Sequence, residues 1–298
     1  MRFSTPSIIF VAVSMTSVIT ASAQQQGTLQ QEVDSWHAKR IESLKAENGW
    51  LNLAGLFWLD EGKNTFGTGK QNKIVFPAGT ITEDAGYFER TGDIITFFAS
   101  PKAKVLVNGK EVKQAVVFHP DSVRSAPTLS YGSLKWNFIK RDEKIGLRLR
   151  DLKSETLTKF KGIERFPVKE EWKTEATIQK SSAPTVAITN VLGQTNQQKT
   201  PGKLVFTIDG KQYQLDPIEE GNKLFVVFGD ATSGNETYPA GRFVYCDKPD
   251  ENGKTVLDFN KAYNPPCAFS PYATCPLPPK QNILPIAITA GEKNWGEH

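Results

Sequence analysis

The sequence predicts a mainly β protein, a β-sandwich or a barrel-like fold, with one amphipathic helix near its N-terminus. Three observations predict it. One early segment has helical spacing of its apolar residues, the rest of the chain has short apolar runs separated by Gly, Pro, Asn and Asp, and two of those runs carry hairpin signals. Because one hairpin falls in each half of the chain, two β subdomains stay open as an alternative to one continuous domain.

The composition fits a folded protein with a mixed surface. Hydrophobic residues make up 39% of the 298 residues, which is enough to build a core and argues against disorder. The 36 basic and 32 acidic residues are dispersed, and the net charge is only +4. A nucleic-acid-binding surface needs a basic stripe, so no nucleic-acid partner is expected.

Residues 1–23 have the features of a secretory signal peptide. Arg2 supplies the positive end, residues 8–13 are apolar, and Ala21-Ser22-Ala23 has the small-x-small pattern of a cleavage site. The apolar run is too short for a membrane helix, and no cysteine follows the cut to carry a lipid. We therefore expect an exported protein, periplasmic or extracellular, without a stable membrane anchor.

Residues 24–48 contain the predicted helix. Its apolar side chains recur at helical spacing between 29 and 47, namely Leu29, Val33, Trp36, Ile41 and Leu44. Asn48-Gly49 is a typical helix end, because Asn tolerates and Gly favours left-handed backbone geometry. We expect this helix to pack across the β core as a lid or strap.

Residues 49–152 form the predicted first β half. Asn108-Gly109 joins two short strands and suits a type I′ turn. Leu134, Trp136 and Phe138 alternate with polar residues, and Leu147 and Leu149 alternate with Arg148 and Arg150, so each segment is expected to have one buried face and one polar face.

Residues 153–173 are predicted as a connector, and residues 174–298 as the second β half. Asp209-Gly210 is the second hairpin signal. Residues 224–228 are apolar throughout, as in a strand that is covered on both sides.

Several familiar sites are disfavoured by residue type and spacing. The chain has three histidines, His37, His119 and His298, and no G-x-S-x-G motif, which argues against a Ser-His-Asp type of triad. Paired Cys or His spacing for zinc is absent. Gly67 to Lys70 is glycine-rich but lacks the spacing of a phosphate-binding loop. No metal is assigned, and the cofactor is left open.

Polar chemistry concentrates in residues 229–242 and 258–279. The candidate catalytic residues are Asp230, Glu236, Asp258, Arg242 and Tyr263, and the candidate binding residues are Thr232, Ser233, Tyr238, Asn260, Asn264 and Tyr272. Carboxylates with an arginine and tyrosines could supply the acid, base and anion clamp of a hydrolase. The oxygen-bearing side chains could also hold Ca²⁺. The simplest alternative is that they cap turns and form internal ion pairs.

Three functional hypotheses follow from this cluster. The best-supported interpretation is a small-molecule pocket with hydrolase-like polar groups. A non-catalytic module for a sugar or another small polar ligand is the first alternative, and a structural or partner-binding protein is the second. The pocket hypotheses require the two segments to meet around a solvent-accessible hollow.

The three cysteines, Cys246, Cys267 and Cys275, allow at most one internal disulfide. Cys267 and Cys275 share one proline-rich loop, so this pair is the candidate disulfide, and closing so small a ring would contribute roughly 2–3 kcal/mol. Cys246 lies in an apolar, strand-like context and is expected to pack as a small hydrophobic residue.

Long motifs resemble the domain-of-unknown-function 1684 family. They are FGDATSGNETY (228–238), GRF (241–243), DFNKAYNPPCAF (258–269) and YATCPLPP (272–279), with GWL (49–51), GLFWL (55–59), FKGIE (160–164) and FP (166–167). The resemblance covers nearly all of the expected mature chain and implies no established activity. Many members look cytoplasmic, so it does not imply that the two motif cysteines are bonded.

A weaker likeness in the first half is to a forkhead-associated β-sandwich. It covers Phe66-Gly67, residues 72–76 and residues 107–110. Thr68 stands where that family carries its phosphate-gripping arginine. The likeness therefore implies the sandwich shape and not phosphopeptide binding.

Overall fold

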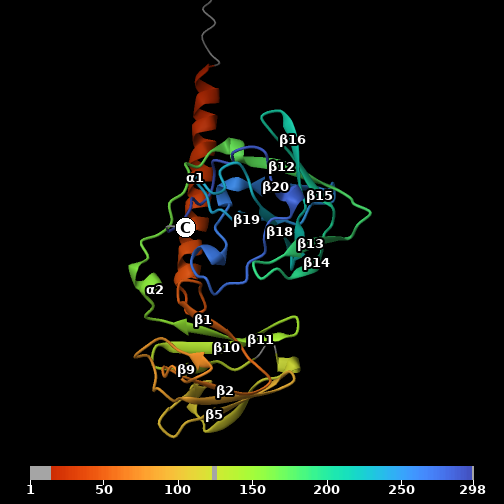
Figure 1. The fold of residues 1–298 in the computed structure, drawn as a ribbon. Helices are drawn as coiled ribbons and strands as arrows, with labels where there is room; N and C mark the ends of the chain where they lie inside the picture. Colours follow the sequence, from red (N-terminus) through yellow and green to blue (C-terminus); the bar gives the residue numbers. More distant parts are fainter. Residues whose placement is uncertain (1–14, 123–125, 297–298) are drawn as a thin grey trace, which may run out of the picture.

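The computed structural model describes residues 15–122 and 126–296, and the side chains of residues 25, 27–121 and 126–296. The expected leader falls mostly outside this description, since residues 1–14 and the side chains of residues 15–24 are not part of it. His298 is also outside it. Within the described residues the chain is mainly β, as predicted, with two β halves stacked end to end (Figure 1).

The first half is a sandwich of two open sheets. One sheet has the order β1 (Leu53–Trp58), β11 (Lys144–Asp151), β10 (Leu134–Arg141), β9 (Leu129–Tyr131), β6 (Leu106–Val107), β7 (Lys110–Glu111). The other has the order β3 (Ile74–Val75), β2 (Gly62–Gly67), β4 (Gly86–Thr91), β5 (Ile94–Ala99), β8 (Gln114–Phe118). Rings from both sheets, including Phe66, Phe88 and Trp136, form one buried core. The sandwich expectation is confirmed, and neither sheet closes on itself.

Both predicted hairpin turns are confirmed by their backbone angles. Asn108 and Gly109 have φ of 49° and 79°, and Asp209 and Gly210 have φ of 50° and 72°. Two successive positive φ values define the type I′ turn, whose twist matches the flanking strands. These turns join β6 to β7, and β15 (Lys203–Ile208) to β16 (Lys211–Leu215).

The polar face predicted for β11 is partly wrong. Leu147 and Leu149 face the core as expected, but Arg148 is also buried, with 9% of its surface exposed. Its guanidinium lies 5.4 Å from the Trp50 ring. Alternation of apolar and polar residues gives an exposed polar face only where one side of a strand meets solvent, whereas the second half of the chain stacks against this sheet (Figure 1).

The second half contains three smaller sheets. Their orders are β16-β15-β12 (Lys173–Gln179)-β20 (Lys254–Asp258), then β17 (Ile218–Glu220)-β18 (Lys223–Phe228)-β19 (Arg242–Asp247), then β13 (Thr185–Thr189)-β14 (Thr195–Lys199). A shared core, including Phe206, Phe228 and Phe259, joins the first two. Strand β18 is buried at Leu224, Val226, Val227 and Phe228, as predicted. Short helical segments complete the chain: α2 (Glu155–Lys159), η1 (Pro120–Ser122), η2 (Glu170–Trp172), η3 (Phe259–Lys261), η4 (Pro266–Ala268) and η5 (Lys280–Asn282).

Helix α1 (Met15–Lys45) runs along the side of the second half and ends at the junction of the halves (Figure 1). Leu29 and Val33 pack on Val168 of the connector, and Leu44 packs with Leu51. Gly49 is required after the helix, because a Cβ there would lie 2.2 Å from the Leu44 carbonyl oxygen. The expected strap is therefore present, with its last helical residue at Lys45.

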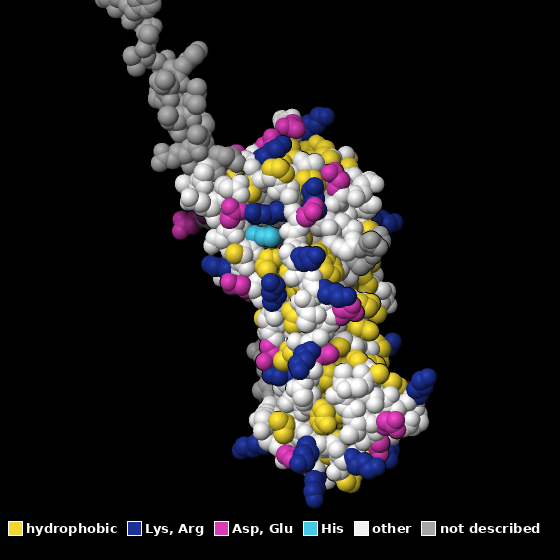
Figure 2. Space-filling model, turned by 90° about the vertical axis from the view of Figure 1, so that its left-hand side faces the viewer, with side chains coloured by type: hydrophobic (Ala, Val, Ile, Leu, Met, Phe, Trp, Pro, Cys, Tyr) yellow, Lys and Arg dark blue, Asp and Glu magenta, His cyan; other side chains and the backbone are white. Residues whose placement is uncertain are grey.

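Basic and acidic side chains are interspersed over the face that carries α1 (Figure 2). Among the described helices, neither has the length and apolar character needed to cross a membrane.

Candidate functional site

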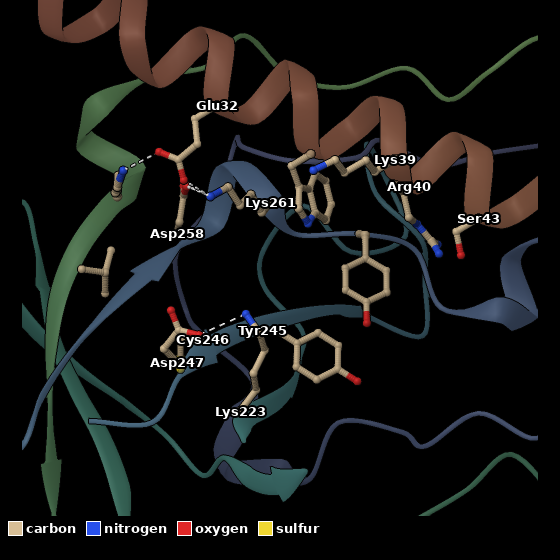
Figure 3. A pocket seen from close by; sticks show the side chains of 14 residues that line it. Glu32, Lys39, Arg40, Ser43, Lys223, Tyr245, Cys246, Asp247, Asp258 and Lys261 are labelled. Atoms are coloured by element: carbon tan, nitrogen blue, oxygen red, sulfur yellow. Dashed lines mark hydrogen bonds and ion pairs between the residues drawn. The ribbon is translucent and has the colours of Figure 1, made fainter. Parts of the chain in front are cut away.

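A pocket of about 590 Å³ lies between α1 and the strands of the second half (Figure 3). Residues from six segments line it: Glu32, Trp36, Lys39, Arg40 and Ser43 of α1, Lys173 of β12, Lys223 of β18, Tyr245, Cys246 and Asp247 of β19, Val256 and Asp258 of β20, and Lys261 and Tyr263 of the segment after it. This volume is in the range of small-molecule sites, which are about 300–1,000 Å³.

Helix α1 presents one face to the pocket. Glu32, Trp36, Arg40 and Ser43 are spaced by three or four residues, which brings their side chains to the same side of a helix. Figure 3 shows Glu32 and Arg40 directed from the helix towards the strands. The helix therefore forms one wall of the pocket.

Ion pairs from Glu32 tie this wall to the strands. Its Oε2 lies 3.0 Å from Lys173 Nζ, and its Oε1 accepts a hydrogen bond from Lys261 Nζ. Hydrogen bonds from Lys261, the larger effect, and from Lys173 lower the pKa of Glu32. The hydrogen bond to Glu32 in turn raises the pKa of Lys173. Glu32 is thus ionised and already engaged at neutral pH.

Aromatic rings form the second wall. The Tyr245 and Tyr263 rings stack with their centroids 6.3 Å apart and an angle of 12° between their planes. The centroid of the Trp36 ring lies 6.2 Å from that of the Tyr263 ring. Burial raises the pKa of both tyrosine hydroxyls above the ordinary value. Tyr245 donates to Glu220 Oε2 at 2.6 Å. Both phenols therefore stay protonated at neutral pH.

Arg40 is held in place from behind the pocket. Its guanidinium lies 4.6 Å from the centre of the Tyr263 ring, Nη2 donates to the Asn264 carbonyl at 2.9 Å, and Nε lies 3.4 Å from Glu292 Oε1. Glu292 is buried, which raises its pKa, and it also accepts from Asn264 N at 2.7 Å. Arg40 is thus a fixed part of the wall.

Asp258 has one oxygen committed and one open. Oδ1 accepts from the backbone N and side-chain Nδ2 of Asn260, at 3.0 and 2.9 Å. Oδ2 is buried, accepts no hydrogen bond from the described residues and lies 3.5 Å from Lys261 Nζ. Glu32 and Asp258 therefore flank the same ammonium group.

The lining carries an excess of positive charge. Five Lys or Arg side chains face three Asp or Glu side chains, an excess of two. Lys223 pairs with Asp247 at 3.0 Å. Within the described part of the chain, Lys39 has no hydrogen-bond or ion-pair partner. Lys39 is therefore a cation available to a ligand.

Two of the predicted catalytic residues line this pocket, Asp258 and Tyr263, while Asp230 and Arg242 lie in the core. Arg242 Nη2 lies 2.9 Å from Asp230 Oδ2 and donates to the Ile288 carbonyl at 2.9 Å. Asp230 Oδ1 accepts from N and Oγ1 of Thr232, at 2.8 and 2.6 Å. Burial lowers the pKa of Arg242. This pair stabilises the fold and is closed to a substrate.

The other predicted residues lie outside the pocket lining. Glu236 is exposed, and Ser233 Oγ accepts from Asp230 N at 3.2 Å in the same turn. Tyr238 packs with the cluster at the end of α1. Asn260 makes two hydrogen bonds with the Lys169 backbone, and Asn264 Nδ2 donates to the Lys293 carbonyl at 2.7 Å. Tyr272 is 37% exposed outside the pocket.

Sequence reasoning missed most of the pocket. The α1 residues carried a signal, because their spacing gives the helix a polar-aromatic stripe beside its apolar one. Lys173 and Lys223 carried none. The oxygens suggested for Ca²⁺ are divided between the Asp230 network and Asp258, and the described residues contain no group of three His, Cys, Asp or Glu side chains arranged for a metal ion.

Comparison with known proteins gives a family and no activity. A family model described as "Protein of unknown function (DUF1684)" matches residues 158–293. The solution NMR structure of an uncharacterized protein from Haloarcula marismortui is 32% identical over 48% of this chain and 82% of that chain, with a TM-score of 0.41. No curated protein matches.

Proposed function

Because this chain belongs to the DUF1684 family, which has no assigned activity, we propose its function from the pocket under α1. The protein is an exported binding protein for a small polar organic anion, such as a sugar acid. The observation that carries the proposal is the lining itself, where aromatic rings and a surplus of cations surround one hollow.

The charge of the pocket supports an anionic ligand. The carboxylates Glu32 and Asp247 are in ion pairs, whereas Lys39 has no such partner within the described residues. An ammonium group at a pocket wall gains most from a carboxylate or phosphate, because charge-assisted hydrogen bonds are roughly twice as strong as neutral ones.

The rings support a ligand with an apolar face. Tyr245 and Trp36 offer large, rigid contact areas, and the protonated hydroxyl of Tyr263 offers a donor. The ion pair between Lys223 and Asp247 presents both donors and acceptors to hydroxyl groups. A sugar ring with one carboxylate combines these three requirements.

A specific observation favours hydrolysis as a second candidate. Asp258 Oδ2 is buried, has no hydrogen-bond partner among the residues that the structure describes, and lies 3.5 Å from Lys261 Nζ, as an acid or base awaiting a substrate would. Binding ranks first because the other lining carboxylates are engaged and the phenols are protonated. Export rests on the leader-like residues 1–23.

Calorimetric titration and thermal shift with galacturonate and galactose test the proposal. Galacturonate at about 100 times its Kd should stabilise the fold by about 2.7 kcal/mol, whereas galactose should bind at least about tenfold more weakly. Lys39→Ala should remove the preference for the acid, and Lys110→Ala, an exposed lysine of the first half, should not.

Ring variants test the stacking wall. Tyr245→Ala should weaken binding, while Tyr245→Phe should keep it, because Phe retains the ring and loses only the hydrogen bonds of the hydroxyl with Glu220 and Tyr263. Equal binding of acid and neutral sugar by the parent protein would refute the anion proposal. Turnover of a glycoside of galacturonate that disappears in Asp258→Asn would favour the second candidate.

A further inference from the structure

Cys267 and Cys275 lie in contact in the second half, outside the pocket. Cys275 Sγ accepts a hydrogen bond from Cys267 N at 3.1 Å, and Cys267 Sγ lies 3.5 Å from the Ala273 carbonyl oxygen. Both are free thiols. We propose that this pair is a thiol–disulfide exchange site that reacts with small organic disulfides and closes reversibly into a Cys267–Cys275 bond.

The two thiols are not equivalent. Cys267 is half-buried, whereas Cys275 is only 4% exposed. The hydrogen bond between the two side chains lowers the pKa of Cys267, and the same bond with burial raises the pKa of Cys275. The less buried thiol, which ionises first, is the attacking group, and its more buried neighbour is the resolving group.

A buried cation adjoins the pair. Arg148 is 9% exposed, its Nε has no hydrogen-bond partner within the described residues, and it lies within electrostatic reach of Cys275. Its guanidinium lies over the Trp50 ring and makes no ion pair in that same part of the chain. This positive charge lies near Cys275, where it favours the thiolate that the resolving step requires.

The loop around the pair is fixed at both ends. Val191 N donates to the Cys275 carbonyl at 3.0 Å, and Leu277 N donates to the Thr189 carbonyl at 2.8 Å, which attaches one side to the β13–β14 hairpin. Cys267 lies in the η4 turn. The sulfurs are therefore held as neighbours, so bond formation needs only a local change.

The exchange proceeds in two balanced steps. The Cys267 thiolate attacks one sulfur of a disulfide RSSR, forming a mixed disulfide and releasing RS⁻. The Cys275 thiol loses its proton to solvent, and its thiolate attacks the Cys267 sulfur, forming the internal bond and releasing the second RS⁻. The protein loses two electrons and two protons, and RSSR is reduced to two thiols.

Cys246 provides an internal control. It is buried in the second core, and burial raises its pKa to about 11. The other two free thiols, Cys267 and Cys275, contact each other and not Cys246. The proposed exchange pair and a buried single thiol therefore occur in the same chain.

The test uses the full chain, reduced and then incubated with oxidised glutathione as the probe. After acid quenching, denaturation and alkylation, peptide mass spectrometry should find Cys267 and Cys275 joined and Cys246 alkylated. Dithiothreitol added to the native protein should return both thiols. Cys275→Ser should accumulate glutathione on Cys267, and Cys267→Ser should react at least about tenfold more slowly than the parent. Cys246→Ser should match the parent.

Three results would overturn the proposal. They are full alkylation of Cys267 and Cys275 in the parent after incubation, glutathione on both sulfurs without a bond between them, and a Cys267→Ser rate equal to that of the parent. If circular dichroism shows that a serine variant does not fold, the exchange rate of the parent is compared between the native and the denatured protein. Exchange at a preformed site must be faster in the native protein, and an equal rate would also overturn the proposal.

Discussion

Asp230→Asn removes the charge from a buried ion pair while keeping the size of the side chain. The side chains of Asp230 and Arg242 are 1% and 0% exposed, and Oδ2 lies 2.9 Å from Nη2. An asparagine can keep its oxygen towards Thr232 N. Its amide nitrogen then faces the guanidinium, so a donor opposes a donor and Arg242 loses its counter-charge.

The expected loss of stability is large for a substitution that only replaces one carboxylate oxygen of Asp230 by an amide nitrogen. Removing one partner of a buried pair costs about 3–5 kcal/mol, because the remaining charge is left without compensation. Arg242 keeps its hydrogen bonds to the carbonyls of Ile288 and Ala290, which places the estimate inside this range. A loss of this size lowers the melting temperature by roughly 6–20 °C.

Urea unfolding followed by tryptophan fluorescence and calorimetry measures the effect. Trp172 lies in the core that contains Arg242's neighbours Phe228 and Ile288, whereas Trp136 lies in the first half. The midpoint of the unfolding transition should move to a lower urea concentration. Glu175→Gln is the matched control, because its pair with Lys254 is 61% and 49% exposed and should contribute no more than about 1 kcal/mol.

The reasoning fails if Asp230→Asn costs no more than Glu175→Gln. A double variant, Asp230→Leu with Arg242→Met, gives an independent check. It removes both charges at once, and it should be more stable than Asp230→Leu alone, because apolar replacement of a whole pair avoids the unpaired ion.

Two further predictions concern Asn282 and His37. Asn282→Ala should lower the free energy of unfolding in urea by about 2–3 kcal/mol, because the Asn282 side chain hydrogen-bonds with the Asp216 N, Asp216 O and Val227 O groups. The control is Asn196→Ala at an exposed position, and equal losses in the two variants would contradict the prediction. Burial lowers the pKa of His37 from 6.5. As the pH decreases, His37 therefore gains its proton in the unfolded chain before it does so in the folded protein. The stability that His37 contributes above pH 6.5 should fall as the pH decreases through 6.5 to the lower pKa of the folded state. His37→Gln should flatten this slope between about pH 7.5 and about pH 5.5, and an unchanged slope would count against it.

The local features of the fold could be predicted from the sequence. Helical spacing identified α1, and Asn108-Gly109 and Asp209-Gly210 fixed two turns, because each depends on neighbouring residues. Arg148 could not be placed, because its burial depends on the stacking of the second half on β11. Contacts between parts of the chain that are distant in sequence determine whether that face of β11 is buried.

The pocket was predictable only in part, for the same reason. Asp258 and Tyr263 were identified from a polar motif at the end of a strand, and both line the pocket. Asp230 and Arg242 looked equally suited, but the carbonyls that enclose Arg242 lie 46 and more residues further along the chain. The Glu32–Lys261 contact spans 229 residues, a separation at which spacing rules carry no information.

The position of α1 has a consequence for biosynthesis. The helix is synthesised before residues 173–292, to which the surfaces that cover Glu32, Trp36 and Arg40 belong. Until those residues have been made, the side chains of this helix face have no docking surface. The cavity itself comes into existence only when the last quarter of the polypeptide has been made.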